Sequence, residues 1–522
     1  SSHFGSHHQH HRRMTNDGSA FAESRDLLVV SWNCGGFTRT HSLIKSHYGS
    51  LDKYLSKFGA AVFCVQETKV APAHLQKTGD AAQIGAIVPG YQSFWAFNQQ
   101  KHSGYNGVAT WVRNDLGECR ATQQVLNDPL DTEGRCLLVD LGGLVVINVY
   151  APRVDHTAGK ATSIVEKKLR FLQLLHGRIR ELRLTGKRVL LCGDLNLTLR
   201  PEDCKWSWRK LEVKGGAFGG RGDWPTDLDD GSWVCLGEVS KSLRISCSAP
   251  VDHVESRLKH LSDNLRVTSE IFVGGKAVPV GRTLLSVNQV DVFVHEDVLR
   301  ALAKEPTSTL DFGVRYEDLG QVGESVHFAN ERSCVEELRR VSSQGLLVDT
   351  FSKVHPSAVD RFTCWSQHKN CRYSNTGSRL DYIFCDSETC ELLVGTPTSD
   401  LVGSDSQVCS HEAKAAVNAA TNYGRWHGAL LKAISTDGLG LQEGDMRLND
   451  LQFQHPHTGM LYTPPSYSDH IAVSALFRGM TFAGIPSISE RESRRCTPWV
   501  FQTGLASFLV RGTKRPLDTS DL

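Results

Sequence analysis

The chain has 522 residues, and its 58 Lys and Arg nearly balance its 57 Asp and Glu. The net charge of +1 excludes a strong overall field, so any surface that binds nucleic acid has to be local. The content of 40% hydrophobic and 22% charged residues is typical of globular proteins. No apolar run approaches membrane-spanning length, so we expect a soluble protein without a membrane partner.

The cysteines indicate a reducing compartment. There are 15 of them, an odd number, and none is paired at Cys-x-x-Cys spacing. The His-rich residues 1–13 lack the apolar stretch of a secretory signal. Disulfides and structural zinc are therefore not expected, and free thiols in the nucleus, the cytosol or an organelle fit best.

Short apolar runs alternate with longer runs of helical period in the first two fifths of the chain. Runs of the first kind predict buried strands, and runs of the second kind predict amphipathic helices. The predicted strands are 27–32, 61–65, 91–97, 107–113, 135–141, 144–150 and 189–192, and the predicted helices are 41–58 and 164–184.

The stretch KRVLLCGDLN, at 187–196, organises the rest of the pattern. Its apolar run stops at Gly193, and Asp194 and Asn196 follow with one residue between them. Side chains alternate along an extended chain, so we expect these two on the same side of the strand end. A carboxylate beside an amide can orient and deprotonate a water. Gly-Asp turns also end many strands that carry no chemistry, so this motif alone does not decide the function.

Polar side chains recur at the ends of the other apolar runs. Six such boundaries indicate one sheet edge lined with a single site. The residues concerned are Asn33, Glu67, Tyr150, Asp194 with Asn196, Asp381, and Asp469 with His470.

Two polar, Gly-rich stretches interrupt this rhythm, at about 207–340 and 391–465. Site residues lie on both sides of each, so we interpret them as insertions from loops of one catalytic domain that spans 26–480. Residues 1–25 and 481–522 have little apolar content and are predicted to be disordered tails.

These residue types permit hydrolysis of a phosphate ester. Glu67 is a plausible Mg²⁺ ligand, since such sites use one or two carboxylates and keep several waters. Asp194, assisted by Asn196, would position the attacking water. His470, held by Asp381, would donate to a phosphate oxygen, and Tyr150 offers a second donor. The competing interpretation is a histidine and carboxylates that merely satisfy one another at a sheet edge.

Taken together, the motifs resemble the endonuclease/exonuclease/phosphatase superfamily, and within it the exonuclease III type of apurinic/apyrimidinic (AP) endonuclease. The resemblance covers about 27–206, 345–386 and 466–477. The matching motifs are Trp32-Asn33, Gln66-Glu67-Thr68-Lys69, Gly104-Tyr105-Asn106-Gly107-Val108, Asn148-Val149-Tyr150-Ala151-Pro152, Gly193-Asp194-Leu195-Asn196, Phe362-Thr363-Cys364-Trp365, Arg379-Leu380-Asp381-Tyr382 and Ser468-Asp469-His470.

The resemblance implies an α/β fold, a two-sheet α/β sandwich with the site at one sheet edge. It implies Mg²⁺ at Glu67 with Asp469 near the metal, Mn²⁺ as a substitute, and the catalytic roles given above together with Asn33. It further implies a monomeric nuclear protein, with mitochondria left open, that acts on double-stranded DNA. The implied DNA contacts are Asn106, Arg153, Trp365 and Arg379.

Within this family the chain is most similar to the branch of eukaryotic AP endonuclease 2. Thr363-Cys364-Trp365-Ser366 and Asn375-Thr376-Gly377-Ser378-Arg379 are typical of that branch. The first type has large aromatics at the positions of Cys364 and Ser378, where they line a pocket for a flipped abasic sugar. Their loss implies enzymes that act mainly at 3′ ends, as 3′–5′ exonucleases and 3′-phosphodiesterases, with weaker incision at abasic sites.

The C-terminal segment contains a match to the peptide that binds the sliding clamp PCNA. Such a peptide forms one turn that inserts a leucine and an aromatic residue into a hydrophobic pocket of the clamp. A leucine stands here in place of the usual second aromatic, which weakens the insertion. The matching residues are Gln502, Leu505, Phe508 and Leu509.

Two departures from the family pattern leave rival functions open. Gly35 replaces the acidic or amide residue that normally follows Asn33 by two positions, which removes an oxygen from the metal site. Arg153 replaces an asparagine and adds positive charge near the path of the phosphates. The alternatives are a catalytically weakened scaffold that binds DNA and PCNA, a phosphoinositide phosphatase, and a retrotransposon endonuclease.

Overall fold

Two buried parallel pairs of strands organise the molecule, one in each of two sheets. The computed structural model describes residues 24–75, 78–100, 104–154, 161–205, 208–212, 233–235, 237–238, 243–292, 294–302, 306–313, 325–326, 332–356, 361–366, 371, 376–394, 456–461, 463–464 and 466–481.

The first sheet has six strands in the order β22-β23-β1-β2-β4-β3. Its only parallel pair among the described strands is β1 with β2, where Asn33 lies opposite Gln66. The strands are β1 (Ser24–Asn33), β2 (Val62–Gln66), β3 (Tyr91–Ala96), β4 (Val108–Arg113), β22 (Gly459–Leu461) and β23 (Ala472–Thr481).

The second sheet also has six strands, in the order β18-β21-β8-β7-β6-β5. Here β7 and β8 are parallel, and Tyr150 lies opposite Asp194. The strands are β5 (Arg120–Thr122), β6 (Cys136–Asp140), β7 (Leu144–Tyr150), β8 (Arg188–Asp194), β18 (Val348–Asp349) and β21 (Asp381–Cys385).

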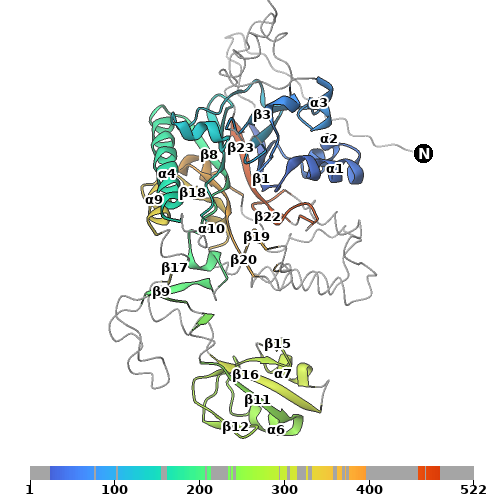
Figure 1. Cartoon of the computed structure of the whole chain (residues 1–522), viewed down its shortest axis with the longest axis vertical. Helices are drawn as coiled ribbons and strands as arrows, with labels where there is room; N and C mark the ends of the chain where they lie inside the picture. The colour runs from blue at the N-terminus through green and yellow to red at the C-terminus, as the bar shows by residue number, and fades with distance from the viewer. Residues whose placement is uncertain are drawn as a thin grey trace, which may run out of the picture.

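Helices cover the outer faces of both sheets, so the architecture is the expected two-sheet α/β sandwich (Figure 1). The crossover between β1 and β2 carries α1 (Phe37–Tyr48) and α2 (Leu51–Phe58), and that between β7 and β8 carries α4 (Ala161–Leu184). The remaining helices of the sandwich are α3 (Thr78–Gln83), α9 (Arg332–Ser343), α10 (Thr350–Val354), α11 (Ser387–Cys390) and the 3₁₀ turns Pro72–Leu75, Asn114–Leu116, Pro129–Glu133 and Pro201–Asp203. Among the described helices, none combines the length and the apolar character that a membrane crossing requires.

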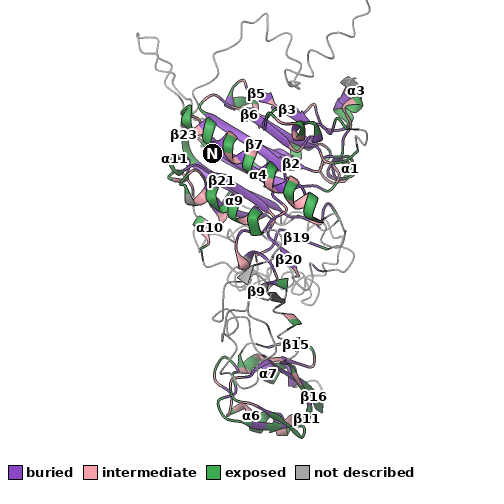
Figure 2. Ribbon diagram, turned by 60° about the vertical axis from the view of Figure 1, so that its left-hand side comes forward, coloured by how far each residue is buried: buried purple, intermediate pink, exposed green. Residues whose placement is uncertain are grey.

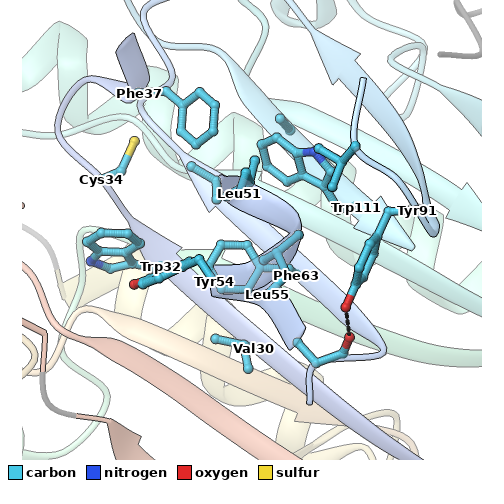
Figure 3. Close-up of a cluster of buried hydrophobic side chains, with 14 of the residues drawn as sticks. Val30, Trp32, Cys34, Phe37, Leu51, Tyr54, Leu55, Phe63, Tyr91 and Trp111 are labelled. Atoms are coloured by element: carbon cyan, nitrogen blue, oxygen red, sulfur yellow. Dashed lines mark hydrogen bonds between the residues drawn. The ribbon is translucent and has the colours of Figure 1, made fainter. Parts of the chain in front are cut away.

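Three apolar layers hold the sandwich together. The central layer lies between the two sheets and includes Val29, Cys64, Val146 and Leu190. The layer between the first sheet and α1 and α2 is the richest of the three in aromatic residues (Figure 3). The third layer packs the second sheet against α4 and α9, which cross its buried strands in Figure 2. Each sheet packs against the central layer on one face and against a helical layer on the other. The strands inside the sandwich are therefore apolar on both faces.

The structure corrects one predicted helix. The segment predicted as a single helix over 41–58 forms α1 and α2, which are separated at Gly49. Gly49 has φ +83, and its N–H caps α1 by donating to the Lys45 carbonyl at 2.9 Å. A left-handed glycine ends a helix even where the apolar period continues beyond it.

The segment at 207–340 is more ordered than the sequence indicates. A four-stranded sheet, a two-stranded sheet and two helices enclose a hydrophobic core of their own. The β11 strand alternates exposed serines with buried Cys247 and Ala249, so its apolar signal is half that of a strand buried on both faces. The elements are β11 (Ile245–Pro250), α6 (Val251–Leu258), β12 (Ile271–Val273), β13 (Lys276–Val278), β14 (Thr283–Val287), β15 (Val290–Asp291), α7 (His295–Leu302) and β16 (Thr307–Gly313).

The sandwich resumes earlier than expected after both polar stretches. Cys334 and Leu338 of α9 pack in the same layer as α4, so the first stretch ends before 332 rather than at 340. The β22 strand pairs with β23 at 459–461, before the predicted end of the second stretch at 465. A small sheet of β9 (Lys210–Glu212), β10 (Trp233–Cys235) and β17 (Ser325–Val326) also lies within the first stretch.

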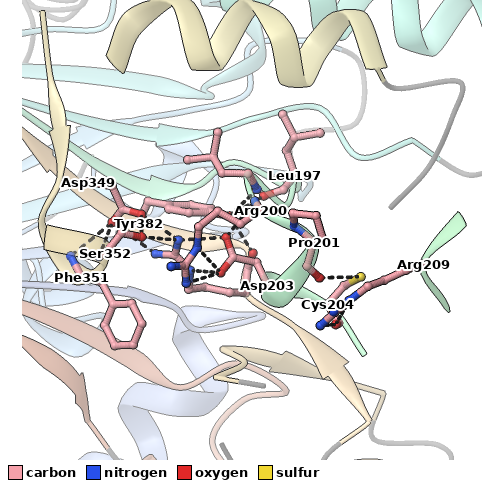
Figure 4. Close-up of polar contacts among 12 residues, drawn as sticks. Leu197, Arg200, Pro201, Asp203, Cys204, Arg209, Asp349, Phe351, Ser352 and Tyr382 are labelled. Atoms are coloured by element: carbon pink, nitrogen blue, oxygen red, sulfur yellow. Dashed lines mark hydrogen bonds and ion pairs between the residues drawn. The ribbon is translucent and has the colours of Figure 1, made fainter. Parts of the chain in front are cut away.

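A buried guanidinium joins three segments of the chain next to β18 and β21. The Arg379 side chain is 1% exposed and donates to both carboxylate oxygens of Asp203 at 2.9 Å. It also pairs with Asp349 at 2.7 Å and stacks on the Tyr382 ring at 4.3 Å. Figure 4 shows Asp203, Asp349 and Tyr382 within one network of polar contacts. The expectation that Arg379 contacts DNA is therefore wrong, because the guanidinium is committed to two carboxylates away from solvent.

We expect Arg379→Met to lower the free energy of unfolding by about 3–5 kcal/mol, because it leaves two carboxylates buried without a cation. Urea unfolding at pH 7 measures this loss. Arg332→Met is the matched control, since its pair with Glu336 is exposed and is worth no more than about 1 kcal/mol. Equal losses in the two variants would contradict the role of the buried cluster.

The pH dependence follows from the same cluster. Burial alone would raise the pKa of Asp349, but the Arg379 guanidinium outweighs burial and holds that pKa below its usual value. Asp349 therefore contributes stability above its unfolded pKa of about 3.9, and this contribution is lost as the pH falls through the lower folded value.

Candidate active site

The strand register brings the predicted polar strand ends to one edge of the sandwich. Asn33 ends β1, and Glu67 follows the end of β2 next to it. In the second sheet Asp194 lies opposite both Tyr150 and Asp381, on the neighbouring strands β7 and β21. His470 lies two residues before the start of β23. The expected clustering of these residues is thus present.

The Asn33 amide connects the two sheets. Its Nδ2 donates to Glu67 Oε1 at 3.0 Å and to Asp194 Oδ2 at 2.8 Å. Its Oδ1 accepts the Gly35 N–H at 3.0 Å, and the residue is fully buried. Both donor hydrogens and the acceptor are therefore used, which fixes the orientation of the amide and the separation of the two carboxylates.

His470 is held between two carboxylates. Its Nδ1 lies 2.8 Å from Asp381 Oδ2, and its Nε2 lies 4.0 Å from Asp194 Oδ2. Asp381 is fixed in turn, because the Thr363 hydroxyl accepts its backbone N–H at 3.2 Å. The interpretation of Asp381 as the partner that orients His470 agrees with this geometry.

Burial and neighbouring charge shift the pKa values of this pair. Burial, and then the nearby Asp381 carboxylate, raise the pKa of Asp194 to about 7, although His470 and the Asn196 N–H act in the opposite direction. Burial alone would lower the pKa of His470, but Asp381 outweighs it and raises that pKa well above 6.5. A carboxylate with a raised pKa can accept a proton near neutral pH, and an imidazole with a raised pKa stays charged and can donate a hydrogen bond.

The Tyr150 hydroxyl lies against Glu67 and stays protonated. Burial first, and then the charges of Glu67 and Asp194, raise the pKa of Tyr150 above its usual value of 10. The Arg135 guanidinium lies 5.2 Å from the centre of its ring, and Arg135 also pairs with Glu133 at 2.7 Å. Tyr150 therefore presents a neutral O–H donor at the sheet edge.

Asn196 acts through its backbone. Its φ of +47° ends the extended conformation, so the alternation expected after Asp194 does not hold. The Asn196 N–H donates to Asp194 Oδ1 at 2.7 Å, while its side-chain Nδ2 donates to the Ala151 carbonyl at 3.0 Å. The buried Lys168 of α4 in turn donates to the Asn196 carbonyl at 2.5 Å. Asn196 thus fixes Asp194 within a rigid turn.

Oxygen ligands for a hard divalent cation lie beside Gly35. The Asp469 carboxylate faces this position, since a Cβ on Gly35 would lie 3.6 Å from Asp469 Oδ1. Lys69 Nζ lies 2.9 Å from Glu67 Oε2 and donates to the Gly35 carbonyl at 2.8 Å. Two carboxylates and a carbonyl fit Mg²⁺, which keeps several waters and needs few protein ligands.

Lys69 is a residue to which the sequence assigned no role. Burial alone would raise the pKa of Glu67, but hydrogen bonds from Asn33 and Lys69 outweigh it and lower that pKa. The Lys69 ammonium therefore favours the charged form of Glu67. The signal was present in the Gln66-Glu67-Thr68-Lys69 motif, where a lysine follows the predicted ligand by two residues.

The predicted DNA contacts divide into accessible and buried residues. Arg153 is exposed, and Asn106 is partly exposed with φ +58° and donates to the Glu133 carbonyl at 3.2 Å. Trp365 is 3% exposed and packs with Phe362 and Ile471, so the expectation that it contacts DNA is wrong. An indole enclosed by its own apolar cluster has no face to offer a base. The predicted clamp-binding residues, Gln502, Leu505, Phe508 and Leu509, lie outside the described residues.

Comparison with known proteins gives a consistent family. Residues 30–312, more than half of the chain, match the model of the endonuclease/exonuclease/phosphatase family. The chain is 32% identical over 209 residues to DNA-(apurinic or apyrimidinic site) endonuclease 2 of Xenopus laevis, covering 34% of this chain and 37% of the relative. It is 32% identical over 226 residues to the human protein of the same name, covering 36% and 41%.

The chain spans about two fifths of the length of these relatives. Among solved structures it is similar to the catalytic domain of Xenopus laevis APE2, with 18% identity and a TM-score of 0.43 over 88% of this chain and 94% of that one.

We expect Gly35→Asp to tighten binding of Mn²⁺ by on the order of tenfold, because a third carboxylate would join Glu67 and Asp469. Electron paramagnetic resonance of free Mn²⁺ measures the affinity without any substrate. Gly35 has φ +61°, so the substitution also costs about 1 kcal/mol of stability. Gly35→Ala is the matched control, because it carries a similar backbone strain without a side-chain oxygen. Equal affinities for the two variants would place residue 35 outside the coordination sphere.

Proposed function

Because the chain belongs to the endonuclease/exonuclease/phosphatase family, we propose that it is a divalent-metal-dependent DNA repair nuclease that acts mainly at 3′ ends. Its activities are 3′–5′ exonuclease and 3′-phosphodiesterase, with weaker AP endonuclease activity. The single observation that carries the proposal is the Asn33 amide, which holds Glu67 and Asp194 at fixed positions beside the Asp381–His470 pair.

Asp194 orients and deprotonates the attacking water. Its Oδ2 accepts from Asn33 and its Oδ1 accepts from the Asn196 N–H, so the carboxylate cannot rotate away. A pKa raised by burial brings its basicity near to neutral pH, where a general base is most effective. Asn196 and Asn33 are positioning residues in this scheme, and Asp194 is the catalytic residue.

His470 and Tyr150 donate to the phosphate. Asp381 holds the imidazolium with Nε2 directed to the site, and the Tyr150 O–H stays protonated. Both donors are buried and preorganised, so they stabilise charge that develops on the phosphate oxygens. Bound at Glu67 and Asp469, Mg²⁺ or Mn²⁺ would neutralise phosphate charge and stabilise the leaving oxygen.

The preference for 3′ ends follows from the residues around His470. Cys364 and Ser378 pair across β19 (Cys364–Trp365) and β20 (Gly377–Ser378), and neither carries an aromatic ring. The neighbouring Trp365 is buried in its own cluster, so it does not replace the missing wall. Without an apolar wall, a flipped abasic sugar gains little binding free energy, whereas a frayed 3′ end needs no such pocket.

The partners that fit this activity are double-stranded DNA with abasic sites or blocked 3′ ends, and the clamp PCNA. Exposed Arg153 lies three residues after Tyr150 and would contact the phosphates. A nuclear protein acting as a monomer is consistent with such a role. Gly35 favours one alternative, a weakened scaffold, because it removes a metal ligand.

We expect Asp194→Asn and His470→Ala each to reduce nuclease activity by on the order of 10²-fold or more, because one loses the base and the other a donor. Both are measured on short duplexes with Mg²⁺ and with Mn²⁺. His176→Ala is the matched control, since His176 pairs with Glu337 between α4 and α9 and should leave the rate unchanged. Wild-type rates in both site variants would contradict the assignment, and a wild type that never cuts DNA would favour the scaffold.

The same assay tests the preferred substrate. On duplexes of matched sequence, removal of a 3′ blocking group or resection of a recessed 3′ end should exceed incision at an internal abasic site. A phosphoinositide added in parallel should remain intact. Faster incision at the internal site would show that another part of the chain rebuilds the pocket.

We expect Phe508→Ala to weaken binding of PCNA at least about tenfold while basal cleavage of short DNA stays unchanged, because Phe508 supplies the apolar insertion. Calorimetry of the full chain against PCNA measures the affinity. Phe501→Ala, an aromatic outside the spacing of the motif, is the control. Absence of detectable binding by the wild type at high micromolar concentration would reduce the motif to coincidence.

A further inference from the structure

The Cys364 thiol lies next to the catalytic histidine. Cys364 and His470 face one another in an antiparallel bridge. Backbone hydrogen bonds hold this bridge from both sides, because the Trp365 N–H donates to the Asp469 carbonyl at 3.1 Å and the Ile471 N–H donates to the Thr363 carbonyl at 2.8 Å. Facing residues of such a bridge have Cβ atoms about 4.5–5.5 Å apart. The thiol is thus fixed beside the imidazole by the main chain.

Three metal-ligating atoms converge at this point. The Cys364 Sγ, an oxygen of Asp469 and a ring nitrogen of His470 all lie within 4.8 Å of one another. In a tetrahedral zinc site, bond lengths of about 2.0–2.3 Å place neighbouring ligand atoms roughly 3.3–3.8 Å apart. Small side-chain rotations close that difference. A thiolate, an imidazole and a carboxylate form a ligand set that soft divalent ions accept and Mg²⁺ rejects.

The surroundings of His470 complete the geometry of a zinc ligand. A zinc-binding histidine directs its other ring nitrogen to a carboxylate or carbonyl, which fixes the tautomer. Asp381 Oδ2 lies 2.8 Å from His470 Nδ1, so Nε2 is the nitrogen left to face the cluster. The Ser468 hydroxyl donates to the Asn33 carbonyl at 2.7 Å and lies 3.4 Å from Asp469 Oδ1.

The cluster is open to ions from solvent. Cys364 and Asp469 are both partly exposed, while His470 is buried behind them. The carboxylate of Asp194, 4.0 Å from His470 Nε2, adds negative charge that attracts a cation. The ligand set also differs from the oxygen set at Glu67, because it contains sulfur and nitrogen.

We propose that Cys364, Asp469 and His470 form a binding site for Zn²⁺ or a similar soft divalent cation, which shares Asp469 with the oxygen site at Glu67 but adds sulfur and nitrogen ligands. On binding, the Cys364 thiol releases its proton to solvent and a metal–sulfur bond forms, with no change of oxidation state. An occupied site uses His470 Nε2, which is then unavailable to a phosphate. The cation is therefore an inhibitor of any hydrolysis that needs this histidine.

The experiment is a titration of the full chain with Co²⁺, a spectroscopic substitute for Zn²⁺, in the absence of DNA. The wild type should bind one equivalent with a thiolate-to-cobalt charge-transfer band and visible bands of tetrahedral intensity. Cys364→Ser should lose the charge-transfer band and bind at least about tenfold more weakly. Cys235→Ser, which removes a thiol elsewhere, should keep both. Zn²⁺ should displace Co²⁺ and abolish the bands.

A second variant separates ligation from folding. Asp381→Asn should keep the charge-transfer band but bind Co²⁺ about 10–100-fold more weakly, since it removes only the group that orients His470. Circular dichroism tests whether each variant is folded. If Cys364→Ser is unfolded, Cys364→Ala is used in its place. The proposal would be overturned if the Cys364 variant kept a charge-transfer band of equal strength and bound Co²⁺ as tightly as the wild type does. It would also be overturned if the wild type showed no band. Because binding is the readout, the result does not depend on whether the chain cuts DNA.

Discussion

The hydrogen bonds of one asparagine set the geometry on which the candidate site depends. Asn33 comes from the first sheet, and its Nδ2 reaches Glu67 in that sheet and Asp194 in the second. Each carboxylate has to stay acceptor-only for these bonds to form, so the amide favours their charged forms. The two sheets meet here with a fixed separation, since a buried amide that lost either bond would leave a donor unsatisfied, at a cost of about 1–3 kcal/mol.

Negative charge accumulates around this amide, and the structure distributes cations to balance it. Glu67 is neutralised by Lys69 at 2.9 Å, and Asp381 by His470 at 2.8 Å. Asp194 has no cation closer than His470 Nε2 at 4.0 Å among the described ion pairs, and burial raises its pKa accordingly. One carboxylate of the three is therefore left basic. A hydrolytic site needs this difference, because carboxylates that were all neutralised could not accept a proton.

The same sheet edge also explains why one region can offer two kinds of cation site. Gly35 lies beside the Asp469 carboxylate, close to Glu67, whereas Cys364 brings a sulfur atom close to Asp469 and His470. Oxygen ligands favour hard ions such as Mg²⁺, whereas sulfur and nitrogen ligands favour soft ions, so the ligand type selects the ion at each site. No cysteine pattern of the sequence indicates structural zinc, and the absence of such a pattern is compatible with a site that a soft ion occupies only to inhibit.

The local pattern of the sequence determined the strands, the amphipathic helix over α4 and the polar residue at the end of each strand, because periodicity and turn residues depend on neighbours a few positions away. Distant contacts decided the rest. Arg379 is a buried structural residue because Asp203, 176 positions earlier, pairs with it. Asn196 leaves the extended conformation, Trp365 is enclosed, and Cys364 meets His470 only because separate segments pack together. Burial and charge balance are properties of that packing, and no linear pattern contains them.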